Sequence, residues 1–329
     1  MRAKGINYDT GFTPAGGSSR PHFDPAEARA ELRTIAEELH CTAVRITGDD
    51  PQRIALAAEY AAEHGLEIWF APFPCGLDEQ AMRPVLLDSA RRAEQLRAAG
   101  AEVVLVLGCE LTLFADGLLP GAGLGDRMAA LFRPETWQTM PAVLARLNAF
   151  LADTAAACRA EFGGRITYAS GVWERIDWTP FDLVAVDAYR DAHNAARYRD
   201  ELRAHFAHGK PVAVTEFGCC TYAGAADRGG LGWDVIDRSV EPPAVRPGLV
   251  RDKQEQARHL RELLPVFEEE GVDAAFWFTW AGYRAPHRPE DPAHDLDLGS
   301  YGVVALENGT RRPKAVFTAL AEAYRPDRP

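Results

Sequence analysis

The 329-residue chain lacks the patterns that mark a disulfide framework, a zinc site or a nucleic-acid-binding surface. Its six cysteines are scattered without C-x-x-C spacing, so we expect most of them to be reduced and predict no metal site. The chain has 36 basic and 48 acidic residues, a formal net charge of -12, whereas a phosphate backbone requires clustered Lys and Arg. A neutral or cationic small ligand therefore fits better than a nucleic acid.

Long apolar runs and a nucleotide-binding turn are also missing. No stretch is long enough for a signal peptide or a membrane span, and residues 1–5 lead directly into a strand-like segment, so we expect a cytoplasmic protein without membrane contact. The first strand-like run continues into residues 9–12 without a G-x-G-x-x-G turn, which disfavours an open, doubly wound sheet. The glycines between residues 121 and 125 have the wrong spacing and suggest a flexible lid. We predict no cofactor.

Eight short apolar, β-branched or aromatic runs alternate with segments rich in Ala, Leu, Glu and Arg, which predicts parallel strands joined by helices. The segment from Asp24 to His40 shows helical spacing, and Asp24 and Pro25 form a capping pair at its start. Because eight such strands close into a barrel, we predict an α/β protein in which residues 1–329 form a single (β/α)8 barrel. The runs cover residues 5–8, 43–46, 68–71, 103–106, 166–169, 183–186, 212–215 and 275–278.

The loops predicted after the first, fourth, seventh and eighth strands are long. Residues 221–247 follow the seventh strand and residues 281–301 follow the eighth, both with several Gly and Pro residues. Barrel enzymes keep their active sites on the face that carries these loops. We therefore expect functional residues at the carboxyl ends of the strands.

Two strand ends carry a glutamate. The fourth predicted strand ends at Glu110 and the seventh at Glu216, so each delivers a carboxyl group to the mouth of the barrel. Such a pair can cleave a glycosidic bond, because one group protonates the leaving oxygen while the other stabilises the positive charge on the sugar carbon. Arg45 on the second strand, with Asp187 and Tyr189 on the sixth, could hold one of the two glutamates ionised.

In these residues the chain resembles a clan A glycoside hydrolase, in which the acid/base glutamate ends strand four and the nucleophile ends strand seven. The resemblance spans nearly the whole chain and includes a closing segment at residues 301–304 and 312–315. It implies these roles: general acid/base for Glu110, nucleophile for Glu216, partners of the nucleophile for Arg45 and Tyr189, and a floor under the sugar ring for Trp280.

The chain departs from that clan at one position. The clan usually places an asparagine before the acid/base glutamate, where it hydrogen-bonds to the sugar 2-hydroxyl, and this chain has Cys109 there. A thiol is a weak substitute for the hydrogen-bonding amide of asparagine. We therefore expect either the substrate to differ from the clan's usual sugars at its 2-position or the reaction to differ from hydrolysis. Residues 215–222, with residues 295–297 and 300–302, also resemble chains labelled abortive-infection proteins, a label that implies no mechanism.

Other strand-end residues are secondary candidates. Glu174 and Trp173, after the fifth strand, could act as a rival acid and as a sugar-stacking surface. His22 in the first loop and His193 after the sixth strand could donate hydrogen bonds to a substrate. Three cysteines could converge near the mouth, although thiols at tight barrel positions more often act as small hydrophobes. They are Cys109, Cys219 and Cys220.

Three functions follow from these residues. The first is a retaining glycosidase or transglycosylase that acts on a small saccharide or glycoside, with a covalent intermediate on Glu216 and carboxyl groups about 5 to 5.5 Å apart. The second is a natural-product cyclase or isomerase that uses Glu110 as a proton donor, which Cys109 and the lack of a secretion signal favour. The third is a non-catalytic carbohydrate-binding or defence protein, which the presence of both glutamates disfavours. The pattern specifies neither the sugar nor the oligomeric state.

Overall fold

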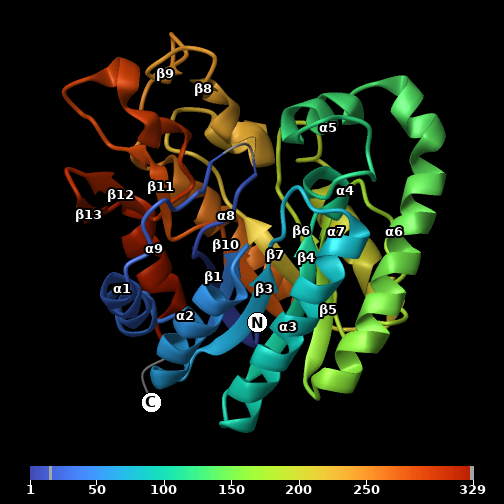
Figure 1. Ribbon diagram of the computed structural model, residues 1–329. Helices are drawn as coiled ribbons and strands as arrows, with labels where there is room; N and C mark the ends of the chain where they lie inside the picture. Colours follow the sequence, from blue (N-terminus) through green and yellow to red (C-terminus); the bar gives the residue numbers. More distant parts are fainter. Residues whose placement is uncertain (15–16, 327–329) are drawn as a thin grey trace.

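A closed barrel of eight parallel strands forms the centre of the computed structural model (Figure 1), which describes residues 1–14 and 17–326. Each strand lies beside the next one in the chain, and β10 closes the barrel against β1. The predicted barrel is therefore confirmed, and the first-loop residues 15–16 and the terminal residues 327–329 lie outside the described part. The barrel strands are β1 (Ala3–Asp9), β2 (Ala43–Gly48), β3 (Glu67–Pro72), β4 (Val103–Cys109), β5 (Arg165–Gly171), β6 (Val184–Asp187), β7 (Val212–Phe217) and β10 (Ala274–Trp277).

Helices surround the barrel (Figure 1). The first of them begins where the sequence predicts, because the Asp24 side chain accepts hydrogen bonds from two backbone N–H groups of the first turn. Its buried face carries Leu32 and Ile35. No helix within the described residues is long and apolar enough to cross a membrane. The helices are α1 (Pro25–Glu37), α2 (Pro51–Glu63), α3 (Glu79–Ala98), α4 (Leu111–Phe114), α5 (Leu124–Leu131), α6 (Pro134–Glu161), α7 (Tyr198–Ala204), α8 (Glu255–Glu270) and α9 (Ala315–Tyr324), with the 3-10 turn η1 (His205–His208).

The interior of the barrel is filled with side chains. Trp69 of β3 and Phe276 of β10 are fully buried, and their ring centroids lie 4.8 Å apart. A Cβ atom on Gly5 of β1 would lie 2.3 Å from the Phe276 ring, so this strand position requires glycine. Because side chains fill the interior, a substrate can approach the barrel residues only at an end of the barrel.

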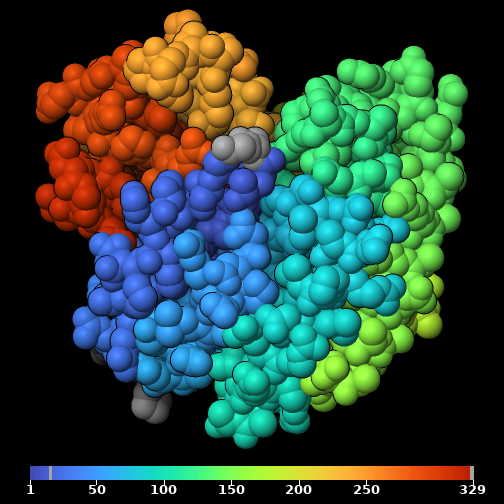
Figure 2. All heavy atoms as spheres, viewed as in Figure 1, coloured from blue at the N-terminus to red at the C-terminus, as the bar shows by residue number. Residues whose placement is uncertain are grey.

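The long segments after β4, β7 and β10 contain short helices and strands of their own. Gly123 directly precedes α5, so the predicted lid at residues 121–125 includes the start of a helix, where Asp126 accepts a hydrogen bond from the Ala122 N–H. Figure 2 shows that the surface is hollowed between the segment after β7 (orange) and the segment after β4 (green). The short elements are η2 (Ala225–Val235), β8 (Ile236–Asp237), β9 (Ala244–Val245), β11 (Ala281–Pro286), η3 (Pro292–His294), η4 (Leu296–Gly299), β12 (Val304–Glu307) and β13 (Thr310–Pro313).

Candidate active site

The Glu216 carboxylate, near the end of β7, is held by two hydrogen-bond donors. Arg45 Nη1 of β2 lies 2.7 Å from Oε1, and the Tyr189 hydroxyl lies 2.9 Å from Oε2. The same Arg45 nitrogen donates to Asn7 Oδ1 of β1 at 2.8 Å, and Arg45 is almost completely buried. Because the side chain of Glu216 is still 14% exposed, a fixed carboxylate oxygen faces the mouth of the barrel.

Glu110 directly follows β4 and has an unusual backbone conformation. Its φ of 43° and ψ of 47° lie in the left-handed region, which costs a non-glycine residue about 1 kcal/mol or more. A hydrogen bond of 2.9 Å from its N–H to the Ala169 carbonyl of β5 anchors this conformation. Strained residues of this kind are concentrated at functional sites, and here the strain fixes the direction in which the carboxyl group leaves the strand.

The surroundings of the Glu110 carboxyl group favour its protonated form. Burial raises the pKa of Glu110 well above its ordinary value, and the negative charges of Asp187, Glu216 and Glu174 raise it further. The positive charge of Arg45 opposes this shift but is the smallest of these influences. Glu110 and Glu216 therefore differ in environment as an acid and a nucleophile must, since one is surrounded by negative charge and the other is paired with a cation.

Cys109 and Asp187 form a buried pair beneath the two glutamates. Asp187, at the end of β6, is paired in register with Glu216 on β7, and the Cys109 Sγ atom lies 3.2 Å from Asp187 Oδ2 and 3.8 Å from Glu216 Oε1. Burial, together with the charge of Glu216, raises the pKa of Asp187 to about 8. Burial also raises the pKa of the Cys109 thiol well above its ordinary value, which disfavours the thiolate form that a nucleophile requires.

Side chains of Cys109, Asp187 and Glu216 could in principle hold a metal ion. Their potential ligand atoms lie within 4.8 Å of one another, and they form the one such group found among the described residues. The sequence spacing gave no sign of it because the three residues come from three different strands. The thiol already donates to Asp187, and the Arg45 guanidinium lies against the Glu216 oxygen that a cation would need, so repulsion disfavours a cation there. We assign no ion to this site.

Glu174 lies behind the mouth and supports the segment that carries Glu110. Its Oε1 accepts hydrogen bonds from the N–H and the hydroxyl of Thr112, and its Oε2 accepts from the Tyr168 hydroxyl and the Gly171 N–H. With four donors and only 7% exposure, Glu174 is better placed to fix α4 than to act as the rival acid. Trp173, partly buried, donates from Nε1 to the same Thr112 hydroxyl at 2.9 Å.

The prediction that Trp280 forms a floor under a sugar ring is wrong. Trp280 is 2% exposed, and its ring packs against Phe317 of α9 in the layer outside the barrel. The partly exposed aromatic residue after β10 is Phe278, whose ring contacts Tyr189 and Tyr301 at centroid distances of 6.5 and 5.6 Å. The prediction failed because β10 ends at Trp277, so strand alternation no longer tells which way the following side chains point.

The remaining sequence candidates lie apart from the glutamates. His22 and His193 are exposed, and the only hydrogen bond found for His193 in the described part of the chain runs from its backbone N–H to Asp191. Cys219 and Cys220 are buried in a separate cluster with Tyr301, so they do not converge with Cys109. Asn7, whose side-chain oxygen accepts a hydrogen bond from Arg45, was not among the predicted residues, although an asparagine inside an apolar strand is itself a signal.

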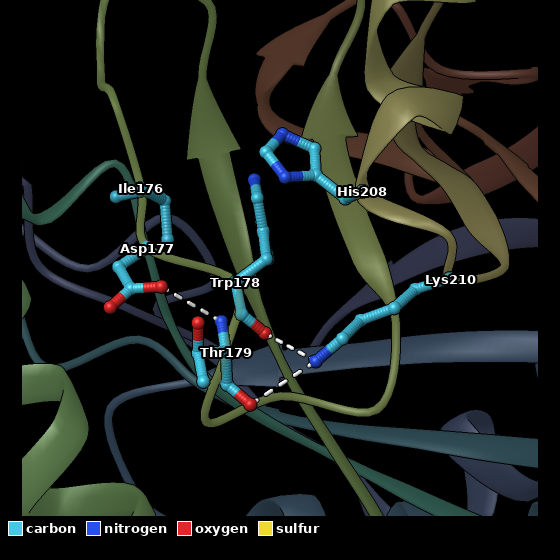
Figure 3. A pocket seen from close by; sticks show the side chains of 6 residues that line it. All are labelled: Ile176, Asp177, Trp178, Thr179, His208 and Lys210. Atoms are coloured by element: carbon cyan, nitrogen blue, oxygen red, sulfur yellow. Dashed lines mark hydrogen bonds between the residues drawn. The ribbon is translucent and has the colours of Figure 1, made fainter.

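Two hollows lie near the amino ends of the barrel strands and away from the glutamates. The smaller one, of about 140 Å³, lies before β6 and β7 (Figure 3), where Lys210 donates to the carbonyl oxygens of Trp178, Thr179 and Phe181. Those three contacts use all the hydrogen-bond donors of the ammonium group, which therefore has a structural role. The larger hollow, of about 480 Å³, includes Arg2 and Glu67, which are paired with each other.

Comparison with known proteins identifies the fold. No protein-family model and no curated protein matches the sequence. Among solved structures, a GH113 β-1,4-mannanase matches 98% of this chain and 99% of its own with a TM-score of 0.65 and 16% identity. The GH113 β-mannanase from Alicyclobacillus acidocaldarius matches 97% and 96% with a TM-score of 0.62 and 19% identity. The endo-1,4-β-D-mannanase from Thermotoga petrophila matches 98% and 99% with a TM-score of 0.56 and 10% identity. The predicted resemblance to clan A glycoside hydrolases is thus confirmed for the fold.

Proposed function

We propose that this chain is a retaining glycoside hydrolase or transglycosylase that acts on a small, neutral or cationic saccharide or glycoside. The observation that carries the proposal is the contrast between two glutamates on one barrel mouth. Glu216 is ion-paired with Arg45, whereas Glu110 is surrounded by carboxyl groups that favour its protonated form. One acid and one carboxylate are the two groups that the reaction requires.

In the first step, the Glu110 carboxyl group donates its proton to the glycosidic oxygen. The bond between that oxygen and the anomeric carbon breaks, and a Glu216 oxygen forms a new bond to the same carbon from the opposite face. Arg45 and Tyr189 hold the Glu216 carboxylate in a fixed orientation for this attack. The products are the protonated leaving group and a glycosyl ester on Glu216.

In the second step, the Glu110 carboxylate removes a proton from a water molecule or from a sugar hydroxyl. The resulting oxygen attacks the anomeric carbon, and the ester bond to Glu216 breaks. Glu110 regains its proton and Glu216 its negative charge, so the enzyme returns to its starting state. Water as the acceptor gives hydrolysis, and a sugar hydroxyl gives transglycosylation.

The comparisons suggest where a search for the substrate should begin. The similar solved structures include two GH113 β-mannanases and an endo-1,4-β-D-mannanase from Thermotoga petrophila, so β-mannosides are the first substrates to test. Cys109 distinguishes this chain from the clan A pattern next to the acid/base, and we infer that it alters recognition of the sugar 2-position. We also infer that the protein acts in the cytoplasm, in keeping with the expectation from its sequence.

Covalent trapping tests the proposal. Wild type, Glu216→Gln and Glu174→Gln would each be incubated with 2-deoxy-2-fluoro glycosides that carry good leaving groups, beginning with the β-mannoside, and their intact masses compared. We expect wild type and Glu174→Gln to gain one glycosyl unit and Glu216→Gln to gain none. Labelling of the Glu216→Gln variant would overturn the assignment of the nucleophile, and labelling lost only in Glu174→Gln would move the nucleophile to Glu174.

The second candidate function is proton-donor catalysis without a glycosyl intermediate, as in a cyclase or isomerase. It is favoured by Cys109, because the side chain before the acid donates to Asp187 rather than facing the mouth as an amide. This alternative predicts that Glu216→Gln keeps activity while Glu110→Gln loses it. Loss of activity in both variants, together with covalent labelling, would exclude it.

A further inference from the structure

The backbone that follows β4 is hydrogen-bonded to β5 and to the segment just after β5. Three successive N–H groups at the start of α4 cannot find a partner within that helix, and each has an acceptor on this side. The pairs are the Glu110 N–H with the Ala169 carbonyl at 2.9 Å, the Leu111 N–H with the Tyr168 hydroxyl at 2.7 Å, and the Thr112 N–H with Glu174 Oε1 at 3.0 Å. Two side chains, together with one backbone carbonyl, thus fix the direction of the chain at the candidate acid.

Tyr168 and Glu174 are bonded to each other as well as to α4. The Tyr168 hydroxyl donates to Glu174 Oε2 at 2.8 Å, so one hydroxyl bridges the carboxylate and the Leu111 N–H. The other partners of Glu174 are the Thr112 hydroxyl at 2.6 Å and the Gly171 N–H at 3.2 Å. Because both side chains are buried and their polar atoms are bonded, the pair has the properties of a rigid support.

The residue held by this support has a strained backbone. Glu110 has a φ of 43°, and a non-glycine residue keeps such a conformation only where its surroundings fix it. Its own carbonyl also has partners, since it accepts from the N–H groups of Leu113 and Phe114 at 2.8 and 3.1 Å. Both peptide groups of Glu110 are therefore held, and removal of the support would allow the backbone to relax and the carboxyl group to move.

The candidate nucleophile is held by a different set of side chains. Glu216 accepts hydrogen bonds from Arg45 of β2 and from Tyr189, which follows β6. Within the described residues, neither of these donors is hydrogen-bonded to Tyr168 or Glu174. Loss of the support should therefore displace the acid and leave the nucleophile in place.

We propose that Tyr168 and Glu174 are positioning residues that hold the Glu110 carboxyl group in the orientation needed for proton donation. They do not contact the substrate in this scheme, because both are buried, and they act through the N–H groups of Leu111 and Thr112. The inference rests on the proposed function, because it concerns the acid of that reaction. It implies that only the step that needs a proton donor depends on the pair.

Two substitutions remove the support with little change in volume. Tyr168→Phe removes the acceptor of the Leu111 N–H and one donor to Glu174. In Glu174→Gln the new NH2 group must face the N–H of either Thr112 or Gly171, whichever way the amide turns, so one backbone donor loses its acceptor. Both variants keep Glu110 and Glu216 themselves.

The dependence of kcat/KM on the leaving group tests the proposal, with the phenyl and dinitrophenyl glycosides of the sugar that covalent trapping identifies. For the phenyl glycoside we expect each variant to lose about 10- to 100-fold, because a misplaced acid donates its proton poorly. For the dinitrophenyl glycoside, whose leaving group needs little protonation, we expect a loss of less than about threefold. The ratio of the two rates is a readout that a merely structural role would not change.

The matched control is Tyr8→Phe. Tyr8 of β1 is also fully buried, and its hydroxyl donates to a buried glutamate, Glu31 of α1, at 2.6 Å. The control removes the same kind of bond away from α4, so it should lower stability but leave the ratio of the two rates unchanged. Equal losses with both glycosides in Tyr168→Phe and Glu174→Gln, or the same change of ratio in Tyr8→Phe, would overturn the proposal.

Hydrogen exchange of the backbone separates this inference from the proposed function. In wild type we expect the Leu111 N–H to exchange slowly, and in Tyr168→Phe at least about tenfold faster, because its acceptor is gone. Unchanged exchange would overturn the inference even if a fluorosugar labels Glu216. If no glycoside is cleaved or labels the protein, the proposed function fails, while exchange still decides whether Tyr168 holds this segment. If Tyr168→Phe does not fold, rapid exchange of the Leu111 N–H in wild type would also reject the inference.

Discussion

The two ends of the barrel differ in how many hydrogen-bond donors surround their carboxyl groups. At the amino end, Glu67 begins β3 and accepts hydrogen bonds from Arg2, Arg165 and the Trp69 indole. At the carboxyl end, Glu110 follows β4, and burial and neighbouring negative charge rather than hydrogen bonds dominate its pKa. A glutamate at the amino end of β3 is thus neutralised by hydrogen-bond donors, whereas a glutamate at the carboxyl end of the neighbouring strand β4 is left available for chemistry.

This difference separates groups that stabilise the fold from groups that can do chemistry. A buried carboxylate with several donors strengthens the native state, whereas one without donors costs free energy that is tolerated where the group has a function. Both hollows near the amino end contain paired charges or satisfied donors, as Lys210 shows. We therefore expect substitutions at the carboxyl end to affect activity and substitutions at the amino end to affect stability.

The largest effect is expected for Glu216→Gln. We expect it to lower kcat by ~10⁴-fold or more, because the amide cannot form the glycosyl ester. Steady-state kinetics on an aryl glycoside would measure the loss, and circular dichroism would show that the fold is kept. Activity within tenfold of wild type would contradict the role of Glu216.

Glu110→Gln should have a smaller and substrate-dependent effect. For a poor leaving group we expect a loss of about 10²- to 10⁴-fold, because proton donation is removed from the first step. For a dinitrophenyl glycoside the first step should be much less affected. The ratio of kcat/KM for the two substrates measures the difference, and equal losses would show that Glu110 does not act as the acid.

His259 on α8 provides a pH test outside the mouth. Both of its ring nitrogens are buried and have no hydrogen-bond partner among the residues that the structure describes. Burial, assisted by the charge of Arg190, lowers the pKa of His259 to about 4. The folded state thus binds fewer protons than the unfolded state between pH 6.5 and 4, so the free energy of unfolding falls as pH falls through this window, by ~3 kcal/mol.

Urea denaturation of wild type and His259→Leu at several pH values would measure this contribution. The variant should lose less stability than wild type between pH 6.5 and 4, because leucine binds no proton. Parallel losses in the two proteins would contradict the buried, neutral state of His259.

Glu67→Gln is expected to have the smallest effect on activity. Its main effect should be on the free energy of unfolding. We expect the free energy of unfolding to fall by about 1–3 kcal/mol, because a buried acceptor loses its charge beside two arginines. Catalytic rates should stay within about twofold of wild type, in keeping with a structural role. Chemical denaturation and kinetics on one preparation would check both expectations. Glu63→Gln, at an exposed ion pair with Arg29, is the control that should change neither.

Much of the fold and part of the candidate site could be predicted from the sequence. Strand alternation and the Asp24 cap mark the barrel elements because these signals are local. Glu110 and Glu216 could be placed on one face, since parallel strands all end on the same side. Trp280 was misplaced because the chain leaves the sheet after Trp277 and no local rule gives the direction of its side chain.

The sequence by itself determined the eight strands, their order and the two glutamates at the mouth, because periodicity and strand ends are properties of short segments. Only the tertiary structure decided which side chains meet. Cys109, Asp187 and Arg45 come from three strands, and their contacts depend on barrel closure and register. The contrast between a paired Glu216 and an uncompensated Glu110 has the same origin, since a pKa reflects all neighbouring charges in space and not the residues adjacent in the chain.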